Sequence, residues 1–397
     1  MIVTLDQLLF REDAAQRLLG FRLVLAANER CHVLLTDPLW EADVADQPIN
    51  RWLSGLPPDL MDAVQKTLEE GVDEASNMSA SVAGILVKPT STSRWEEGVL
   101  SPDDALRLMQ TPLWLVLENG RNDLQFLRRI LERKDRDTLD KHLDEGRVEV
   151  PLGGGTGEVK LFLENLATLP STPTLSRETT SWIRRLRSWA MFDRDAQAND
   201  PRLPSRTSES LRELCAGMAR PWPFPGNQLG RRTIENYLPF EALDRWANGG
   251  DDSAQRRQRV EAFKSSNFGG RRRACFAMKE GFVKDVAQSV REEFKHRDHP
   301  GHKLKIRWVQ ADKLPAAFKS KPRRRGRRLE DSELPTVFQG LQNTAFRVCL
   351  TRGFGTKIAE LYADTDVDDI WFHRVFAEDP AARVWREGLI ESLWGVL

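Results

Sequence analysis

Four acidic residues lie where α/β proteins usually carry their functional groups, near the carboxyl ends of predicted β-strands. Glu118 ends one strand, and Asp193 and Asp195 end another with one residue between them, so an extended backbone would point both aspartates to the same side. Glu235 lies farther along, in the stretch Arg-Arg-Thr-Ile-Glu-Asn-Tyr-Leu. Carboxylates that converge on one edge repel each other, which favours a divalent cation as their neutraliser. Bound Mg²⁺ or Mn²⁺ would activate water and neutralise phosphate oxygens, the chemistry of phosphodiester hydrolysis.

An alternation of apolar runs and amphipathic segments predicts the sheet that positions these acids. Strands are expected over residues 112–117, 147–152 and 186–192. Helices are expected to follow them over residues 124–131, 158–167 and 208–219. Strands joined by helices form mainly parallel sheets that are covered on both faces. The carboxyl ends of such strands meet at one edge, so the acidic residues are expected to lie together.

The order of these residues resembles the TOPRIM domain and, within it, nucleases of the OLD (overcoming lysogenization defect) family. The family pattern is a Glu after the first strand, an Asp-x-Asp pair after the third, and a further Glu in an Arg…Ile-Glu-Asn-Tyr-Leu stretch, which residues 111–240 follow in order. The resemblance implies a Rossmann-like parallel sheet and a site for two Mg²⁺ or Mn²⁺ ions. The metal ligands that it implies are Glu118, Asp193, Asp195 and Glu235, and a catalytic residue is implied at Lys279, in Ala-Met-Lys-Glu-Gly-Phe. How the ligands are divided between the two ions stays open.

The sequence also departs from the family pattern. Asn119 stands where the family has a glycine after the first Glu, and Asp123 comes one residue later than the helix-opening aspartate of the family. A structural alternative is that the strand-end acids only cap the following helices. Capping gives no reason for an Asp-x-Asp pair or for Glu-Asn-Tyr-Leu downstream, so the whole set favours a metal site.

The charge of the chain is segregated, although 59 basic and 59 acidic residues give a net charge of zero. Residues 253–328 hold 23 Lys and Arg against 7 Asp and Glu, whereas residues 1–110 hold 9 against 18. The basic region predicts a surface for a nucleic-acid backbone, with a solvated face or a docking arm for an acidic partner as the alternatives. The predicted contacts to nucleic acid are all arginines: Arg231, Arg232, Arg271, Arg272, Arg273, Arg323, Arg324, Arg325, Arg327 and Arg328.

Composition divides the chain into three expected regions. Residues 1–105 predict an acidic N-terminal domain that is α/β or mostly helical, and residues 106–250 carry the TOPRIM-like units. Residues 251–397 predict a basic, mainly helical region with a mobile loop at 319–328 and a tail, 346–397, that packs back on the body. Further helices are expected over residues 58–70, 255–264 and 282–296, and Ser101 is expected to cap a helix.

Other motifs predict structural roles. The glycine-rich run at 153–157 lacks the Gly-Lys-Ser/Thr of a P-loop and predicts a tight turn. The four cysteines are far apart in sequence and predict reduced thiols, with Cys215 in the core. Three histidines, His296, His299 and His302, predict a solvated turn. The chain lacks an eighteen-residue apolar run, so no membrane association and a cytoplasmic location are expected.

Three functional alternatives follow from these patterns. The first is an endonuclease for DNA or RNA, which by resemblance would be the effector of a bacterial anti-phage system with a separate ATPase partner. The second is a noncatalytic nucleic-acid-binding or partner-docking module with a structural metal. The third, a primase- or topoisomerase-related TOPRIM protein, is weakened because the chain has no zinc-ribbon cysteines and only two tyrosines, Tyr237 and Tyr362.

Overall fold

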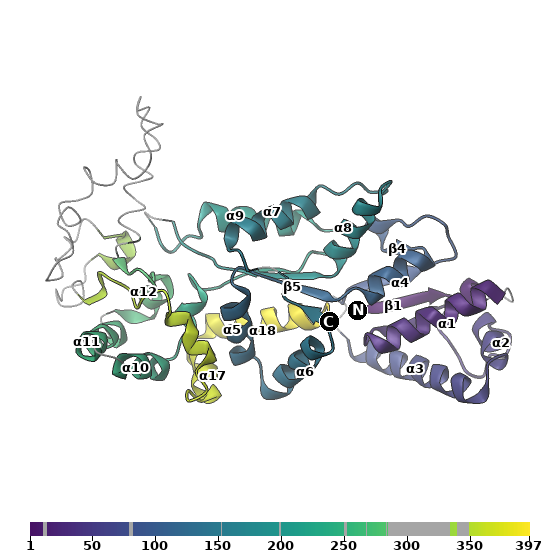
Figure 1. Ribbon diagram of the computed structural model, residues 1–397, viewed down its shortest axis with the longest axis horizontal. Coiled ribbons are helices and arrows are strands. Elements are labelled where there is room, and N and C mark those ends of the chain that lie inside the picture. The colour runs from purple at the N-terminus through teal and green to yellow at the C-terminus, as the bar shows by residue number, and fades with distance from the viewer. Residues whose placement is uncertain are drawn as a thin grey trace, which may run out of the picture.

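The computed structural model describes residues 1–10, 14–78, 82–151, 153–197, 200–249, 252–266, 268–282, 284, 334–339 and 349–397. This part of the chain is a mixed α/β structure with two four-stranded parallel sheets flanked by helices (Figure 1). The expected fold class, an α/β protein with a parallel sheet covered by helices, is therefore confirmed. None of the described helices is long and apolar enough to cross a membrane.

The N-terminal sheet has the strand order β2-β1-β3-β4, and all neighbouring strands are parallel. Its strands are β1 (Ile2–Asp6), β2 (Val33–Asp37), β3 (Gly84–Val87) and β4 (Val99–Leu100). Its helices are η1 (Gln7–Phe10), α1 (Ala14–Glu29), α2 (Pro48–Ser54), α3 (Pro58–Asn77), η2 (Trp95–Glu97) and α4 (Pro102–Gln110). Ser101 caps α4 as predicted, because its hydroxyl accepts a hydrogen bond from the Asp104 amide.

The second sheet has the strand order β6-β5-β7-β8 and is also parallel. Its strands are β5 (Leu113–Leu117), β6 (Val148–Glu149), β7 (Ser188–Phe192) and β8 (Gly226–Gln228). The helices between them are α5 (Gly120–Ile130), α6 (Arg133–Asp144), α7 (Thr156–Ala167), α8 (Ser176–Leu186) and α9 (Arg206–Gly217). The strand expected over 147–152 is limited to β6, which ends before Pro151, a residue that cannot donate a ladder hydrogen bond.

Alternating side chains of β5 build two separate cores, one on each face of the second sheet. Leu115 and Leu117 pack with α5 and α18 (Pro380–Trp394), whereas Val116 packs with α7 and α9, where Cys215 is buried as predicted. Figure 1 shows α5 and α18 on one side of β5 and α7 and α9 on the other. The C-terminal segment thus packs back on the sheet as expected, through α18 and α17 (Asp369–Glu378). Burial on both faces fixes the register of β5 and hence the position of its carboxyl end.

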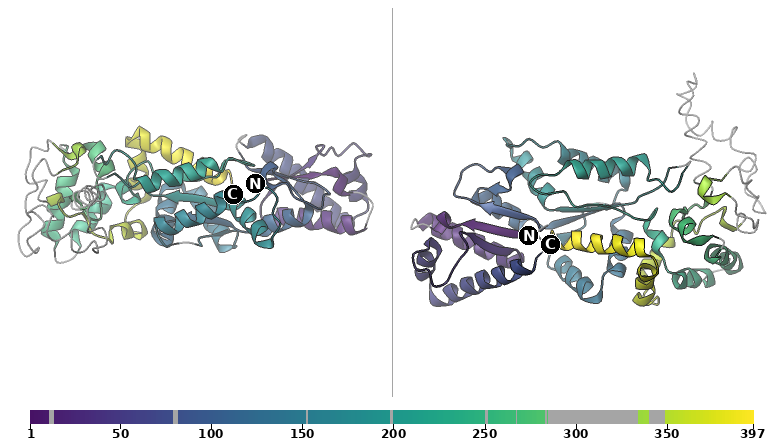
Figure 2. Two further views of the ribbon diagram at one scale, coloured as in Figure 1. Left: turned by 90° about the horizontal axis from the view of Figure 1, so that it is seen from above. Right: turned by 180° about the vertical axis from the view of Figure 1, so that it is seen from behind.

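Further helices follow β8 at the end of the molecule opposite the N-terminal sheet (Figure 2). They are η3 (Ile234–Tyr237), α10 (Phe240–Asn248), α11 (Ser253–Lys264), α12 (Gly269–Cys275), η5 (Thr336–Phe338) and η6 (Ile358–Ala363). A cluster of phenylalanines joins α11, α12 and η5, with Phe263, Phe268, Phe276, Phe282 and Phe338 buried against one another. Apart from Phe282 and Lys284, the helix expected over 282–296 lies outside the described residues, as do the loop at 319–328 and His296, His299 and His302.

Helix α3 approaches β2 so closely at Gly71 that only glycine fits. A Cβ atom added there would lie 2.1 Å from the backbone oxygen of Leu34. We expect Gly71→Ala to lower the melting temperature by several degrees, because α3 must move off the sheet at a cost of about 1–3 kcal/mol. The matched control is Gly388→Ala in α18, where the new Cβ meets nothing within 4 Å and a helix gains up to about 1 kcal/mol. Circular dichroism melting measures both, and an unchanged Gly71→Ala variant would contradict this packing.

Candidate functional site

The carboxyl ends of β5 and β7 bring Glu118 and Asp193 together. The two strands are direct neighbours, with Leu117 opposite Met191, so the residues that follow them leave the same edge of the sheet. The Asp193 amide donates a 2.9 Å hydrogen bond to Oε1 of Glu118. The predicted meeting of these two acids at one edge is confirmed, and the adjacent parallel strands are its cause.

Asp195 reaches the same edge by a different route from the one predicted. Strand β7 ends at Phe192, and Asp195 has a φ of 48°, so the expectation of an extended backbone through Asp195 is wrong. The left-handed turn is tolerated by aspartate better than by most residues, and the Asp195 amide donates to the Arg232 carbonyl at 2.8 Å. The turn leaves the Asp195 carboxylate 3.6 Å from Nζ of Lys284.

A cavity of about 200 Å³ collects these groups. It is lined by Glu118, Thr156, Asp193, Asp195, Arg232, Thr233, Ala277, Met278, Lys279, Glu280 and Lys284. Three carboxylates that follow two strands therefore share one cavity with two lysine ammonium groups, the Arg232 guanidinium and the Glu280 carboxylate. Sequence reasoning missed Thr156 and Lys284, because nothing in the local pattern of either residue distinguishes it from a surface residue.

Glu235 lies outside the wall of this cavity, which departs from its expected place beside the other three acids. It is only 1% exposed, and its Oε1 lies 2.9 Å from Nζ of Lys279, which does line the cavity. The other oxygen, Oε2, is buried and makes no hydrogen bond within the described part of the chain. The geometry therefore assigns Glu235 first to Lys279, whose ammonium group it holds at the cavity.

Several residues of the stretch Arg-Arg-Thr-Ile-Glu-Asn-Tyr-Leu make contacts that hold the backbone around Glu235 in place. The Asn236 amide group donates to the carbonyls of Arg273 and Phe276, which ties η3 to the segment that carries Lys279. The Tyr237 hydroxyl accepts from the Arg231 amide at 2.8 Å, and its ring stacks on Trp385. Flanking residues of the motif are therefore structural, and they fix the chain on both sides of the ion pair.

Burial and crowding raise the pKa values of two acids in the cavity, Asp193 and Glu118. Burial, followed by the charges of Glu118 and Glu235, raises the pKa of Asp193 well above its usual value. Burial raises the pKa of Glu118 too, although hydrogen bonds from Thr156 and from the Asp193 amide partly offset it. Burial alone would lower the pKa of Lys279, but the Glu235 carboxylate, followed by the charges of Asp193 and Glu280, more than offsets this and raises it. Burial is thus the main cause of the raised pKa values of the two acids, and their neighbours' negative charges add to it.

Asp123 is a further buried acid beside the site. It is 6% exposed, and Oδ2 accepts a 2.8 Å hydrogen bond from the Asn119 amide, which closes the turn between β5 and α5. Asn119 in turn caps α5, since its side chain accepts from the Asn122 amide. The later position of Asp123 relative to the family pattern is therefore compatible with a closed turn. Burial, and then the charge of Glu118, raise its pKa to about 7.

We expect Asp123→Asn to remove a pH dependence of stability. The native carboxyl has a pKa of about 7, against 3.8 for the free group. Between pH 4 and 7 the folded protein therefore keeps a proton that the unfolded chain has already released. Its contribution to the free energy of unfolding is present below pH 4 and is lost as the pH rises through 7. The variant should match the parent at pH 4 and exceed it at pH 8 by on the order of a few kcal/mol. Urea titrations at both pH values measure this, with exposed Asp137→Asn as control; parallel pH profiles would contradict it.

The donor set suits a hard divalent cation, because such ions take carboxylate oxygens as ligands. Glu118, Asp193 and Asp195 line one cavity, and burial, to which the charges of neighbouring acids add, raises the pKa values of Glu118 and Asp193. In the described ranges no three Asp, Glu, His or Cys side chains are already gathered tightly enough to hold an ion. The residues therefore fit a metal chemically, and binding would require their side chains to converge.

Most of the described arginines that were predicted to contact nucleic acid have partners within the fold. Arg231 pairs with Asp379 and donates to the Asn236 carbonyl, and Arg232 is fully buried. Arg272 donates to the carbonyls of residues 337 and 339, and Arg273 stacks on the Phe240 ring. These contacts hold the four side chains within the fold, and Arg232 also lines the acidic cavity; their contact with a nucleic-acid backbone stays a prediction. Arg271 is exposed, and the five arginines at 323–328 lie outside the described residues.

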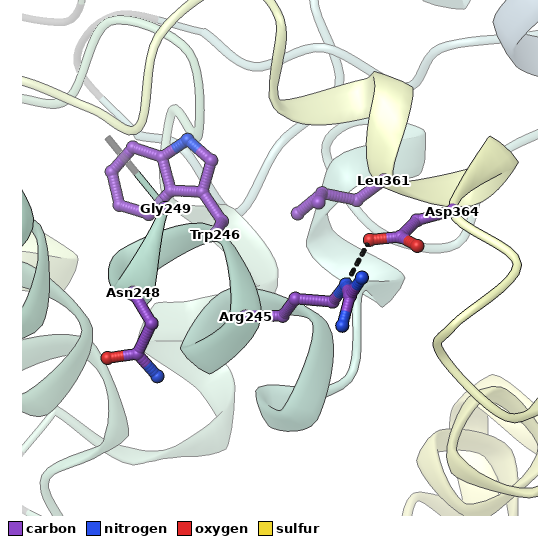
Figure 3. Close-up of a pocket in the computed structure, with 6 residues that line it drawn as sticks. All are labelled: Arg245, Trp246, Asn248, Gly249, Leu361 and Asp364. Atoms are coloured by element: carbon purple, nitrogen blue, oxygen red, sulfur yellow. Dashed lines mark hydrogen bonds and ion pairs between the residues drawn. The ribbon is translucent and has the colours of Figure 1, made fainter.

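A second, more open cavity of about 630 Å³ lies between α10 and η6 (Figure 3). Its wall contains Trp246 and Asn248, and Arg245 crosses it to pair with Asp364. No residue predicted to be functional lines it. The acidic cavity is therefore the candidate site.

The chain was also compared with known proteins. No family model, curated protein or solved structure matches it.

Proposed function

We propose that this protein is a divalent-metal-dependent nuclease that hydrolyses phosphodiester bonds in DNA or RNA through a TOPRIM-type acidic site. The observation that carries the proposal is the shared cavity of Glu118, Asp193 and Asp195 at the carboxyl ends of two neighbouring parallel strands. The order of these acids along the chain, with the Asp-x-Asp pair second, supports the same proposal. In an open parallel sheet this edge is where ligands usually bind.

In this proposal Glu118, Asp193 and Asp195 hold Mg²⁺ or Mn²⁺, two such ions being expected from the TOPRIM resemblance. The metal would supply an activated water and neutralise phosphate oxygens. Lys279, fixed by Glu235, presents a positive charge at the cavity where the scissile phosphate gains charge in the transition state. Lys284 adds a second ammonium group on the same wall. Thus Glu235 acts through Lys279, and its further role as a metal ligand rests on the resemblance alone.

The charge distribution supports a polyanionic substrate. The basic helices α11 and α12 lie at the end of the molecule away from the acidic N-terminal sheet (Figure 2). A basic surface attracts the phosphate backbone irrespective of base sequence, while an acidic lobe repels it. Nucleic acid would therefore approach the acidic cavity from the basic end. The family resemblance adds the proposal of an anti-phage effector with a separate ATPase partner.

The test is incubation of the purified protein with supercoiled plasmid, single-stranded DNA and tRNA in Mg²⁺, Mn²⁺ or EDTA. Cleavage that requires the metal and is lost in a cavity variant would support the proposal, and the substrate that is cut would identify the nucleic acid. Asp137→Asn, exposed on α6, controls for purification artefacts. Absence of cleavage under all metal conditions would contradict the proposal.

A noncatalytic role has one observation in its favour. Lys279 and Lys284 already neutralise part of the acidic charge without any ion, through contacts to Glu235 and Asp195. In a binding module these ion pairs would be permanent parts of the fold. Metal-dependent cleavage separates the two candidates, because a module would bind nucleic acid in gel-shift experiments yet leave every strand intact.

A further inference from the structure

Thr156 makes a contact whose partner lies far away in sequence. Its hydroxyl donates a 2.7 Å hydrogen bond to Oε2 of Glu118, which is 38 residues earlier in the chain. The other carboxylate oxygen, Oε1, accepts from the Asp193 amide at 2.9 Å. Each oxygen of Glu118 therefore has its own donor, and the two donors lie in the segments that follow β6 and β7, the two neighbours of β5 in the sheet. Together they fix the rotation of the carboxylate.

The backbone that precedes Thr156 is held against Glu118 at the start of helix α7. Thr156 is the first residue of α7, and the helix is entered through Gly155, which makes no side-chain cap. Gly155 has a φ of 83°, a conformation that favours glycine, and its amide donates to the Glu118 carbonyl at 2.8 Å. The loop is thus anchored to the backbone of Glu118, and the next residue holds the side chain.

The electrostatics explain why a donor is needed there. Glu118 shares the cavity with Asp193 and Asp195, and repulsion between the carboxylates would turn an unheld side chain away from its neighbours. The Asp193 amide alone would fix one oxygen and leave the carboxylate free to rotate about it. The hydroxyl of Thr156 removes this freedom and lowers the pKa of Glu118 against the effect of burial.

We propose that Thr156 is a positioning residue that holds Glu118 in the orientation required to ligate a divalent cation, an inference that rests on the proposed function. Groups that orient a metal ligand without touching the ion commonly change metal affinity by about 10–100-fold when removed. Thr156 is such a group, since it reaches the ion only through Glu118.

The test compares Thr156→Val, which keeps the shape and removes the donor, with Thr156→Ser, which restores a hydroxyl. Calorimetric titration with Mn²⁺ should show about 10-fold weaker binding or worse for the Val variant, and binding within about 3-fold of the parent for the Ser variant. Thr138→Val on α6, whose hydroxyl donates to the Lys134 carbonyl of its own helix, is the matched control and should bind as the parent does. The melting temperatures in EDTA should stay close to that of the parent for all variants.

Three results would overturn the inference: a Val variant that binds Mn²⁺ as tightly as the parent, a Ser variant that binds as weakly as the Val variant, or a parent that binds no Mn²⁺. A failure of the nuclease proposal can be distinguished from a failure of this inference. If the parent binds Mn²⁺ and cuts no nucleic acid while Val weakens and Ser restores binding, the positioning role stands and the proposed reaction does not.

Discussion

Asp193→Asn is expected to abolish cleavage and, in EDTA, to raise the melting temperature of the protein. Asparagine retains the volume of the side chain, and both backbone contacts remain possible: the amide with Glu118 and the carbonyl with the Ser208 hydroxyl. The change removes a carboxylate whose pKa is raised by burial and by the charges of Glu118 and Glu235. Its removal therefore relieves repulsion in the metal-free protein, while the loss of a ligand should lower the cleavage rate by about 100-fold or more.

The expected changes in cleavage rate and in melting temperature have opposite directions, so the experiment separates a functional role of Asp193 from damage to the fold. Most substitutions that inactivate an enzyme by damaging its fold lower the melting temperature, so increased stability together with lost activity identifies a functional acid. Differential scanning fluorimetry in EDTA and a plasmid-nicking assay in Mn²⁺ measure the two quantities. The control is Asp137→Asn, exposed on α6, which should change neither. A variant that cuts as fast as the parent would remove Asp193 from the metal site.

The sequence was sufficient to predict β5 and β7, the central strands of the second sheet, because their apolar runs differ clearly in periodicity from the helices that follow them. Leu115, Val116 and Leu117 form a continuous apolar run, as expected of a strand with a helix layer on either face, and their burial follows that pattern. The short apolar run at 21–27 cannot be assigned to a strand or a helix from its periodicity alone. In the structure it lies within helix α1. Strand β8 has the sequence Gly-Asn-Gln, which lacks the apolar residues of a strand and forms through pairing with β7.

The candidate site was predictable only where strand ends determine it. Glu118 and Asp193 follow adjacent strands, so their meeting is a consequence of the sheet. The left-handed turn at Asp195 depends on an amide contact with Arg232, and the pairing of Glu235 with Lys279 joins residues that no local pattern connects. Arg232 likewise looks like a surface charge in sequence, whereas the packing of η3 against α12 buries it. Long-range contacts of this kind leave no periodic signal.

Lys279→Met is expected to destabilise the protein more than Glu235→Gln does. Glu235 is 1% exposed and depends on Lys279 for its counter-charge, so the Met variant leaves a buried carboxylate close to the other acids. The Lys279 side chain is 35% exposed, and in Glu235→Gln its ammonium group can turn toward water or the cavity. The asymmetry follows from which partner of the pair can reach solvent.

The double variant Lys279→Met/Glu235→Gln tests the pair directly. It should be more stable than Lys279→Met alone, with a coupling free energy of roughly 0.5–3 kcal/mol, because the second change removes the stranded charge. Urea unfolding of the four proteins gives this coupling, and additive effects would show that the two side chains do not depend on each other. The same set separates two roles of Glu235 in cleavage. If Glu235 acts through Lys279, the activity lost in Glu235→Gln should not return at higher Mn²⁺, whereas a direct ligand would give partial recovery as the ion concentration compensates for weaker binding.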